Sequence, residues 1–130
     1  MIIVDASAML EVLLRTRTGG RIEDRLLGQG ESLHAPHLLD VEVAQVLRRY
    51  AAAGDLSPDR GLEALADLAD FPVNRYAHDM LLPRIWELRH NVTAYDAAYL
   101  ALAEILDAPL VTCDAKLGSA PRHTARVEVY

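Results

Sequence analysis

Short apolar runs along the chain alternate with longer segments of mixed character. Residues 2–4 and 110–113 are mostly β-branched and apolar, and an aspartate follows each run directly, Asp5 and Asp114 respectively. Runs of this length and composition are typical of strands that are buried on both faces of a parallel sheet. Three weaker candidate strands lie at residues 32–35, 72–75 and 126–129.

The longer segments carry apolar residues at the spacing of an amphipathic helix. Residues 38–47 and 62–69 both show this period, and the dipeptide Ser57-Pro58 before the second segment predicts a helix N-cap followed by a first-turn proline. A further, shorter helix is predicted at residues 85–88. The clearest helix spans residues 93–106, which are rich in Ala and Leu and begin with a polar cap residue.

Short strands that alternate with helices indicate an α/β fold, in which right-handed crossovers pack helices against a parallel sheet. The chain has the size of a single domain, residues 1–130, and contains no internal repeat or low-complexity linker that would divide it. Because 52% of the residues are hydrophobic, a core can form without disulfides or a structural metal.

Composition also restricts where the protein works and what it binds. Cys113 is the only cysteine, so no intrachain disulfide can form, and the first residues reach Asp5 too early for a signal peptide or a membrane span. We therefore expect a cytoplasmic protein that does not bind a membrane. The formal net charge of −6 argues against a general nucleic-acid-binding protein, since such proteins neutralise phosphates with Lys and Arg.

Two aspartates are candidate ligands because each follows a predicted strand. In an open parallel sheet, ligands bind beyond the carboxyl ends of the strands, at the point where the direction of winding switches. Asp5 and Asp114 would both lie on that edge. Either residue taken alone is explained as well by a turn or a helix N-cap, since both favour aspartate.

Glu42 and Asp96 are acidic residues within two of the predicted helices. Glu42 lies in a mostly apolar stretch, where partial burial would require a cation, a metal or a proton as its partner. The alternative is an exposed glutamate near the positive N-terminus of a helix. Asp96 follows Thr93 by three residues and fits a capping box, yet it is also the conspicuous polar group of an apolar segment.

Carboxylates that converge on one edge of a sheet repel one another unless a cation compensates them. Mg²⁺ or Mn²⁺ would suit such a cluster, because carboxylate and water oxygens are their preferred ligands, and metal-bound water can hydrolyse a phosphodiester. The four acids account for four of the six net negative charges. The cations then available to hold a polyanion are Arg15, Arg17, Arg21, Arg48, Arg49, Arg89 and Lys116.

Four segments together resemble the PIN-domain family, with the closest likeness to its bacterial VapC-type toxins. They are residues 2–8 with Asp5, the helix around Glu42 that ends in Leu-Arg-Arg, residues 95–104 with Asp96, and residues 112–117 with Asp114. Each motif alone is weak. Their order and separations match those of the family across nearly the whole chain.

The resemblance implies a three-layer α/β/α sandwich around a short parallel sheet, and an endoribonuclease that depends on Mg²⁺ or Mn²⁺. It implies that Asp5, Glu42, Asp96 and Asp114 form the catalytic, metal-binding set. It also implies that the protein is the toxin of a type II, VapBC-like toxin–antitoxin pair, with RNA as substrate, a cognate antitoxin that occupies the active site, and a homodimeric state.

The resemblance extends to residues beside the acids, with one departure. Ser7 and Thr112 match small hydroxyl positions that would orient a carboxylate or a water. Many relatives place a further acid shortly after Asp114, where this chain continues Ala-Lys-Leu-Gly. A second metal would therefore be weakly held, and Lys116 and Arg89 are the cations that would contact substrate phosphate instead.

Two other functions fit parts of the pattern. A non-catalytic PIN-like module would use the acids as helix caps and would sequester RNA or a protein partner. A phosphotransfer or phosphatase domain also places a nucleophilic aspartate after its first strand. Against the latter, Asp5 is followed by Ala6 and Ser7 rather than by a second acid.

Several other side chains are assigned structural roles. His34 and His37 have the spacing of zinc ligands, but no second pair completes a four-ligand site, so we expect surface or packing roles. Cys113 follows an apolar strand without an obvious base, which predicts a buried, unreactive thiol. Core packing is the simplest explanation for the apolar residues around the predicted cleft, with an antitoxin-binding groove as a second use. These residues are Trp86, Tyr95, Tyr99 and Leu100.

Overall fold

The computed structural model describes all 130 residues and is built on a five-stranded parallel sheet. All five predicted strands are present, with ends that agree to within one residue. In chain order they are β1 (Ile2–Val4), β2 (Leu33–Pro36), β3 (Val73–Tyr76), β4 (Leu110–Thr112) and β5 (Val127–Val129).

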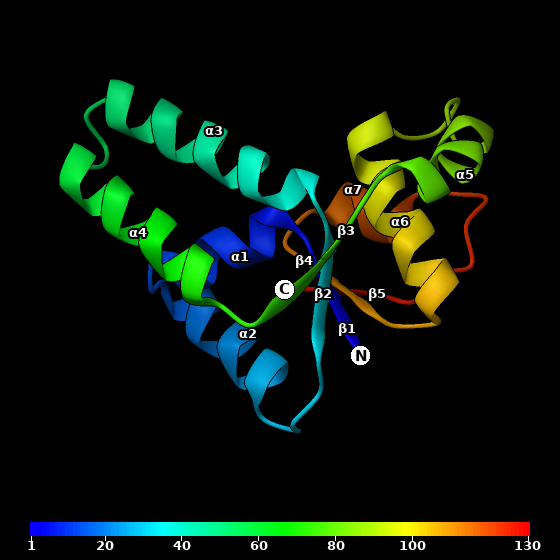
Figure 1. Cartoon of the computed structure of the whole chain (residues 1–130), viewed down its shortest axis with the longest axis horizontal. Helices are drawn as coiled ribbons and strands as arrows, with labels where there is room; N and C mark the ends of the chain where they lie inside the picture. The colour runs from blue at the N-terminus through cyan, green and yellow to red at the C-terminus, as the bar shows by residue number, and fades with distance from the viewer.

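Helices cover both faces of the sheet, which confirms the three-layer α/β/α sandwich. Figure 1 shows α1–α4 on one side of the sheet and α5–α7 on the other. In chain order the helices are α1 (Ala6–Leu13), α2 (Arg17–Leu27), α3 (Leu38–Ala52), α4 (Pro58–Asp70), the 3-10 turn η1 (Asp79–Leu81), α5 (Leu82–Glu87), α6 (Ala94–Leu106) and α7 (Ala115–Ser119).

The four predicted helices correspond to α3–α6, and Ser57 and Pro58 have their predicted roles at the start of α4. The apolar pattern did not predict where α1, α2 and α7 begin and end. In α2 the reason is a tertiary contact: Gly19 packs so closely on α1 that a Cβ there would lie 2.0 Å from the carbonyl oxygen of Glu11. Glycine lowers the local preference for a helix but permits this close packing.

β1 is the centre of the core. Its three residues are fully buried; Ile2 and Val4 pack against the helices of the α1–α4 face, whereas Ile3 packs with α6 on the opposite face. This alternation follows from the two-residue period of a strand. Helix α6 supplies the second layer with an unbroken buried run from Ala97 to Ala103. No helix in the chain is both long enough and apolar enough to cross a bilayer.

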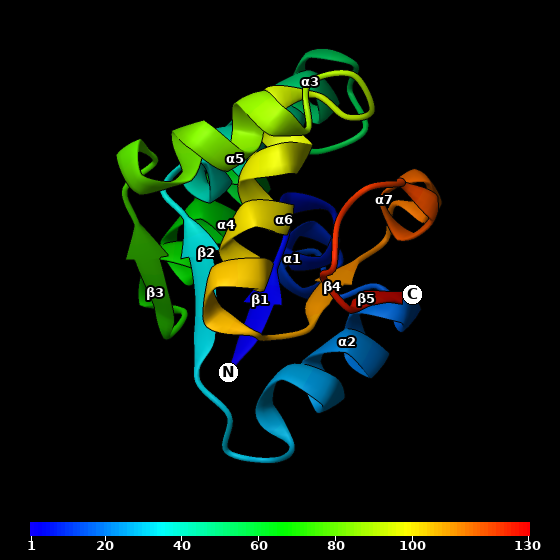
Figure 2. The ribbon, with the colours of Figure 1, turned by 90° about the vertical axis from the view of Figure 1, so that its right-hand side faces the viewer.

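The order of the strands is β3-β2-β1-β4-β5. The chain therefore winds from β1 outward to β3, then crosses back over the sheet through α5 and α6 and continues outward from β4 to β5 on the other side (Figure 2). The winding direction switches between β1 and β4, which are directly paired. Loops that leave two such strands diverge onto opposite faces, and a cleft opens between them.

The buried face of α3 differs in part from the predicted one. Leu39, Val43 and Leu47 are buried at a four-residue spacing, whereas Val41 is 72% exposed. Leu62 in α4 is likewise 68% exposed. Val41 and Leu62 are both apolar residues within helices, but their side chains point away from the sheet. Other residues of α3 and α4 form the apolar face that packs against the core.

This assignment of faces predicts opposite outcomes for two neighbouring substitutions in α3. Leu39→Ala should lower the free energy of unfolding by about 2–5 kcal/mol, because it leaves a cavity in the core. Val41→Ala should change it by less than about 0.5 kcal/mol, as expected at an exposed position. Urea unfolding of both variants measures the difference, and similar losses would show that α3 is rotated from the orientation described.

Candidate active site

Asp5 directly follows β1 and caps the N-terminus of α1, and both of its carboxylate oxygens accept hydrogen bonds. Its Oδ1 accepts hydrogen bonds from the Ser7 hydroxyl at 2.7 Å and the Ala8 N–H at 3.0 Å, while Oδ2 accepts one from the Thr112 hydroxyl. Burial nevertheless raises the pKa of Asp5, which is only 6% exposed, although all three hydrogen bonds act to lower it. Asp5 thus caps α1 and at the same time lines the cleft.

Ser7 and Thr112 lie against Asp5, where the resemblance places them. Thr112 is fully buried at the end of β4, and its hydroxyl oxygen accepts the N–H of Asp114 at 2.9 Å. The Ser7 hydroxyl oxygen accepts the N–H of Cys113 at 2.9 Å. These bonds fasten the chain after β1 to the chain after β4, so the two strand ends hold a fixed relative position.

Asp114 caps α7, since its Oδ1 accepts the Lys116 N–H at 2.9 Å. Its carboxylate faces the same cleft as Asp5. Lys116 is exposed and does not line this cleft, so the structure places its backbone, and not its ammonium group, beside the acids.

Glu42 lies on the second turn of α3 and is half-buried, as its apolar sequence surroundings predicted. The hydroxyl of Tyr99 donates a hydrogen bond of 2.7 Å to its Oε1. Burial raises the pKa of Glu42, and the charges of Asp5 and Asp96 raise it further, against the opposing effect of the Tyr99 bond. Burial and the adjacent Glu42 also raise the pKa of Tyr99, so its hydroxyl remains a donor.

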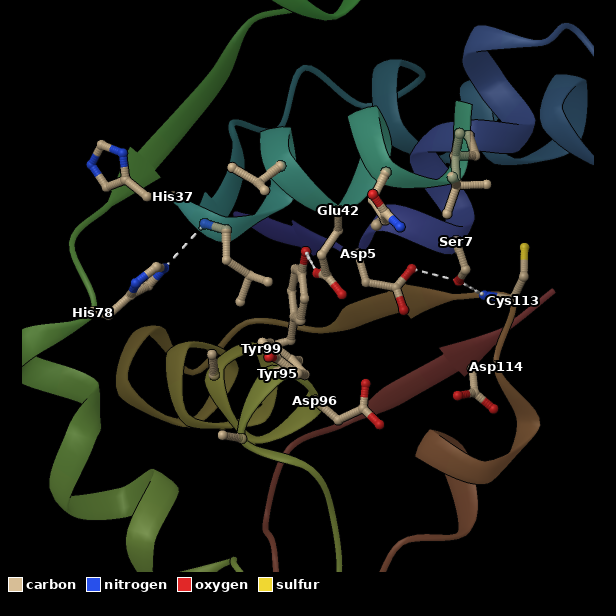
Figure 3. A pocket seen from close by; sticks show the side chains of 18 of the residues that line it. Asp5, Ser7, His37, Glu42, His78, Tyr95, Asp96, Tyr99, Cys113 and Asp114 are labelled. Carbon is tan, nitrogen blue, oxygen red and sulfur yellow. Dashed lines mark hydrogen bonds between the residues drawn. The ribbon is translucent and has the colours of Figure 1, made fainter. Parts of the chain in front are cut away.

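Asp96 projects from the first turn of α6. The capping of this helix is performed by Thr93, whose hydroxyl oxygen accepts the Asp96 N–H at 3.2 Å. The carboxylate itself faces the cleft (Figure 3). Burial, and next the charge of Asp114, raise its pKa.

The four acids therefore converge from four different elements. Figure 3 shows them around one cleft, which has a volume of about 1080 Å³ and runs between α3 and α6. None of the eight ion pairs in the chain involves these carboxylates. Several negative charges thus share a cleft without a paired basic side chain.

The chemistry of this donor set fits a hard divalent cation. All the candidate ligands are carboxylate oxygens, and the raised pKa values of Asp5, Glu42 and Asp96 reflect an electrostatic cost that a cation would relieve. No three His, Cys, Asp or Glu side chains form a ready-made cage for an ion. An ion in this cleft would take part of its coordination from water, as Mg²⁺ commonly does.

Several predictions for the surroundings need correction. Trp86 and Tyr95 are not core residues, since they are 68% and 64% exposed, whereas Leu100 and Tyr99 are buried. Arg89 does not line the cleft; its guanidinium group lies 4.6 Å from the centre of the Trp86 ring. Of the proposed phosphate-binding cations, Arg49 alone lines the cleft.

Tyr99 contacts one of the four acids, a contact that the sequence did not predict, since core packing or an antitoxin-binding groove was expected for it. Its ring does pack in the core, but its hydroxyl reaches an acid on another helix. The available sequence signal is its position three residues after Asp96, which puts both on one face of α6.

The histidines and the cysteine have the following surroundings. His34 is buried in β2, with its ring nitrogens within 2.7 Å of the hydroxyls of Ser32 and Tyr76, which confirms a packing role. His37 is exposed at one end of the cleft. Cys113 is only partly buried and lines the cleft, contrary to the prediction of full burial, but burial raises the pKa of its thiol to about 11 and keeps it protonated.

Comparison with known proteins gives one consistent result. The sequence profile of the PIN domain matches residues 2–122. Ribonuclease VapC9 of Mycobacterium tuberculosis is 46% identical over 117 residues, which cover 90% of this chain and 88% of that protein.

Solved structures agree in fold. PAE2754 from Pyrobaculum aerophilum is 26% identical, with a TM-score of 0.72, over 98% of this chain and 83% of that one. A toxin–antitoxin complex from Klebsiella pneumoniae contains a chain with a TM-score of 0.66 and 17% identity, over 92% of this chain and 91% of that one, which shows a shared fold.

The crowding of carboxylates predicts that one of them destabilises the metal-free protein. The raised pKa of Asp96 means that the folded state holds its proton more tightly than the unfolded state, so stability is lost as pH rises from about 4 through that pKa. In EDTA at pH 7, Asp96→Asn should therefore raise Tm by about 2–6 °C, the range that about 1 kcal/mol produces in a domain of this size.

The gain should disappear well below pH 4, where Asp96 is protonated in both the folded and the unfolded state. Asp24→Asn, at an exposed position on α2, is the matched control and should leave the pH dependence of Tm unchanged. A Tm of Asp96→Asn equal to or below that of the wild type at pH 7 would contradict the electrostatic account.

Proposed function

The chain belongs to the PIN-domain family, alongside the VapC ribonucleases, and from this premise we propose that it is an endoribonuclease and the toxin of a toxin–antitoxin pair. The observation that carries the proposal is the convergence of Asp5, Glu42, Asp96 and Asp114 on one cleft, which Glu11 also lines, with no basic side chain paired to any of them. We place the activity in the cytoplasm, where RNA is available and a lone cysteine stays reduced.

We propose that Asp5, Glu42, Asp96 and Asp114 hold Mg²⁺ or Mn²⁺. Such an ion, when bound, supplies an activated water and neutralises charge on the phosphodiester. Asp5 contributes a carboxylate with a fixed orientation, because Ser7, Ala8 and Thr112 all hydrogen-bond to it. A rigid ligand keeps the reacting groups aligned without an ordering cost at the moment of reaction.

The remaining acids define where the RNA backbone would lie. Glu42 on α3 and Asp96 on α6 approach from opposite walls of the cleft, so a phosphodiester held between them is reached from both sides (Figure 3). Arg49 on the α3 wall is placed to contact a flanking phosphate. A single tightly held ion is favoured, since no further acid follows Asp114 in residues 115–118.

The test is cleavage of RNA by the purified chain with Mn²⁺ and with EDTA. Cleavage should require the metal, and Asp5→Asn should reduce it by more than about 100-fold, since even residues that only support metal ligands cost 10–100-fold when changed. Glu63→Gln, at an exposed position on α4, is the control and should retain activity. Equal activity of wild type and Asp5→Asn would contradict the proposal.

Metal binding separates this function from the rival, a non-catalytic module that uses the acids as caps. Calorimetric titration with Mn²⁺ should give about one tight ion per chain for the wild type and none for Asp5→Asn. Absence of Mn²⁺ binding by the wild type, together with tight RNA or protein binding, would favour the rival.

We further propose that a cognate antitoxin covers this cleft and that the chain forms a homodimer. The apolar part of the cleft supports the first proposal, because Val41 and Leu82 line it and are 72% and 56% exposed. Exposed apolar side chains that line a groove between helices favour an amphipathic helix as their partner. A helix bound in this groove would also block access to the acids.

Substitution of an exposed groove residue tests the antitoxin proposal. Val41→Asp should weaken binding of the antitoxin encoded beside this chain by about tenfold or more, because it puts a charge into an apolar interface. Leu62→Asp is the matched control, since Leu62 is 68% exposed but lies on α4 outside the cleft. Equal affinities of both variants, measured by calorimetry, would place the antitoxin elsewhere.

A further inference from the structure

The hydrogen bond between Tyr99 and Glu42 joins the two walls of the cleft. We propose that Tyr99 is a positioning residue that leaves Glu42 one free carboxylate oxygen, and that this restriction makes the cleft select a small octahedral cation, Mg²⁺ or Mn²⁺, over Ca²⁺. The inference rests on the proposed metal-dependent function and adds the source of its metal specificity.

The geometry of Tyr99 makes the restriction firm. Its side chain is only 2% exposed, in the part of α6 that is buried from Ala97 to Ala103, so the ring has no room to turn away. The hydroxyl lies 2.7 Å from Oε1 of Glu42. If Glu42 bound a metal through both oxygens, Oε1 would have to share its two lone pairs between the metal and the Tyr99 hydroxyl, which would weaken the only hydrogen bond that this buried hydroxyl donates.

The chemistry of the two ions explains why one free oxygen matters. Ca²⁺ takes six to eight oxygen ligands in a flexible arrangement and commonly binds a carboxylate through both oxygens. Mg²⁺ demands an octahedral arrangement of six shorter bonds and keeps several waters. A glutamate that offers one oxygen therefore costs Ca²⁺ a ligand and costs the smaller ion little.

Hydrogen bonds also limit the number of oxygens that Asp5 can offer to a metal. Its Oδ1 already accepts two hydrogen bonds from the chain and its Oδ2 accepts one, from Thr112. Both lone pairs of Oδ1 are therefore used, whereas Oδ2 keeps one for a metal, so Asp5 is also limited to binding through one oxygen. Glu42 differs from Asp5 because its hydrogen bond comes from a single side-chain hydroxyl, that of Tyr99. One substitution at Tyr99 can therefore remove this bond.

Tyr99→Phe removes only this hydroxyl and keeps the buried ring. Titration calorimetry on the full chain should show that the ratio of the Kd for Ca²⁺ to the Kd for Mn²⁺ falls by about tenfold or more, the size expected when one hydrogen bond to a charged group is lost. Tyr95→Phe is the matched control, because Tyr95 also lines the cleft from α6 but is 64% exposed. Its ratio should equal that of the wild type.

A second measurement does not depend on the Tyr99→Phe variant. In the infrared spectrum of the wild type, the Glu42 band, identified by its loss in Glu42→Gln, should show on Mn²⁺ addition the wide separation of carboxylate stretches that marks binding through one oxygen. A narrow separation, which marks binding through both oxygens, would overturn the inference. So would an unchanged Kd ratio in a folded Tyr99→Phe chain.

These outcomes are distinguishable from failure of the proposed function. A wild type that binds neither ion and cleaves no RNA would overturn both proposals. A wild type that binds Mn²⁺ and cleaves RNA, while Tyr99→Phe keeps the same Kd ratio, would overturn only the role of Tyr99.

Discussion

The parallel pairing of β1 with β4 is the constraint on which the site depends. These two strands lie where the winding of the sheet changes direction, so the residues that follow them meet at one edge although more than 100 positions separate them in sequence. Ser7 and Thr112 strengthen this junction by hydrogen bonds that run between the two chain segments. Without that pairing, Asp5 and Asp114 would be two unrelated helix caps.

Bringing the four acids together has a cost in stability. Burial and mutual repulsion raise the pKa values of Asp5, Glu42 and Asp96, so the protein holds charge where folding alone would favour neutral groups. Capping bonds and buried hydroxyls offset part of that cost. The site therefore depends on the surrounding helices to hold its carboxylates together, and a cation would replace repulsion with attraction.

The cleft is lined by both acidic and apolar side chains. The acidic side chains come from the strand ends, the second turn of α3 and the first turn of α6, while exposed apolar residues of α3 and α5 also line the cleft. Tyr99 joins the two sides of the cleft, since its ring is buried on α6 and its hydroxyl donates a hydrogen bond to Glu42 on α3. A partner that covers these apolar residues would also close the cleft over the acids.

The sequence by itself predicted the five strands, four of the helices and the four acids that meet in the cleft, because the strands and helices follow from local period and capping residues and the acids from the order of motifs. It did not determine that Val41 and Trp86 face solvent, that Arg89 lies outside the cleft, or that Tyr99 reaches Glu42. Those facts depend on how α3, α5 and α6 are rotated against the sheet. Helix rotation is set by packing between distant segments, and local sequence patterns carry little information about it.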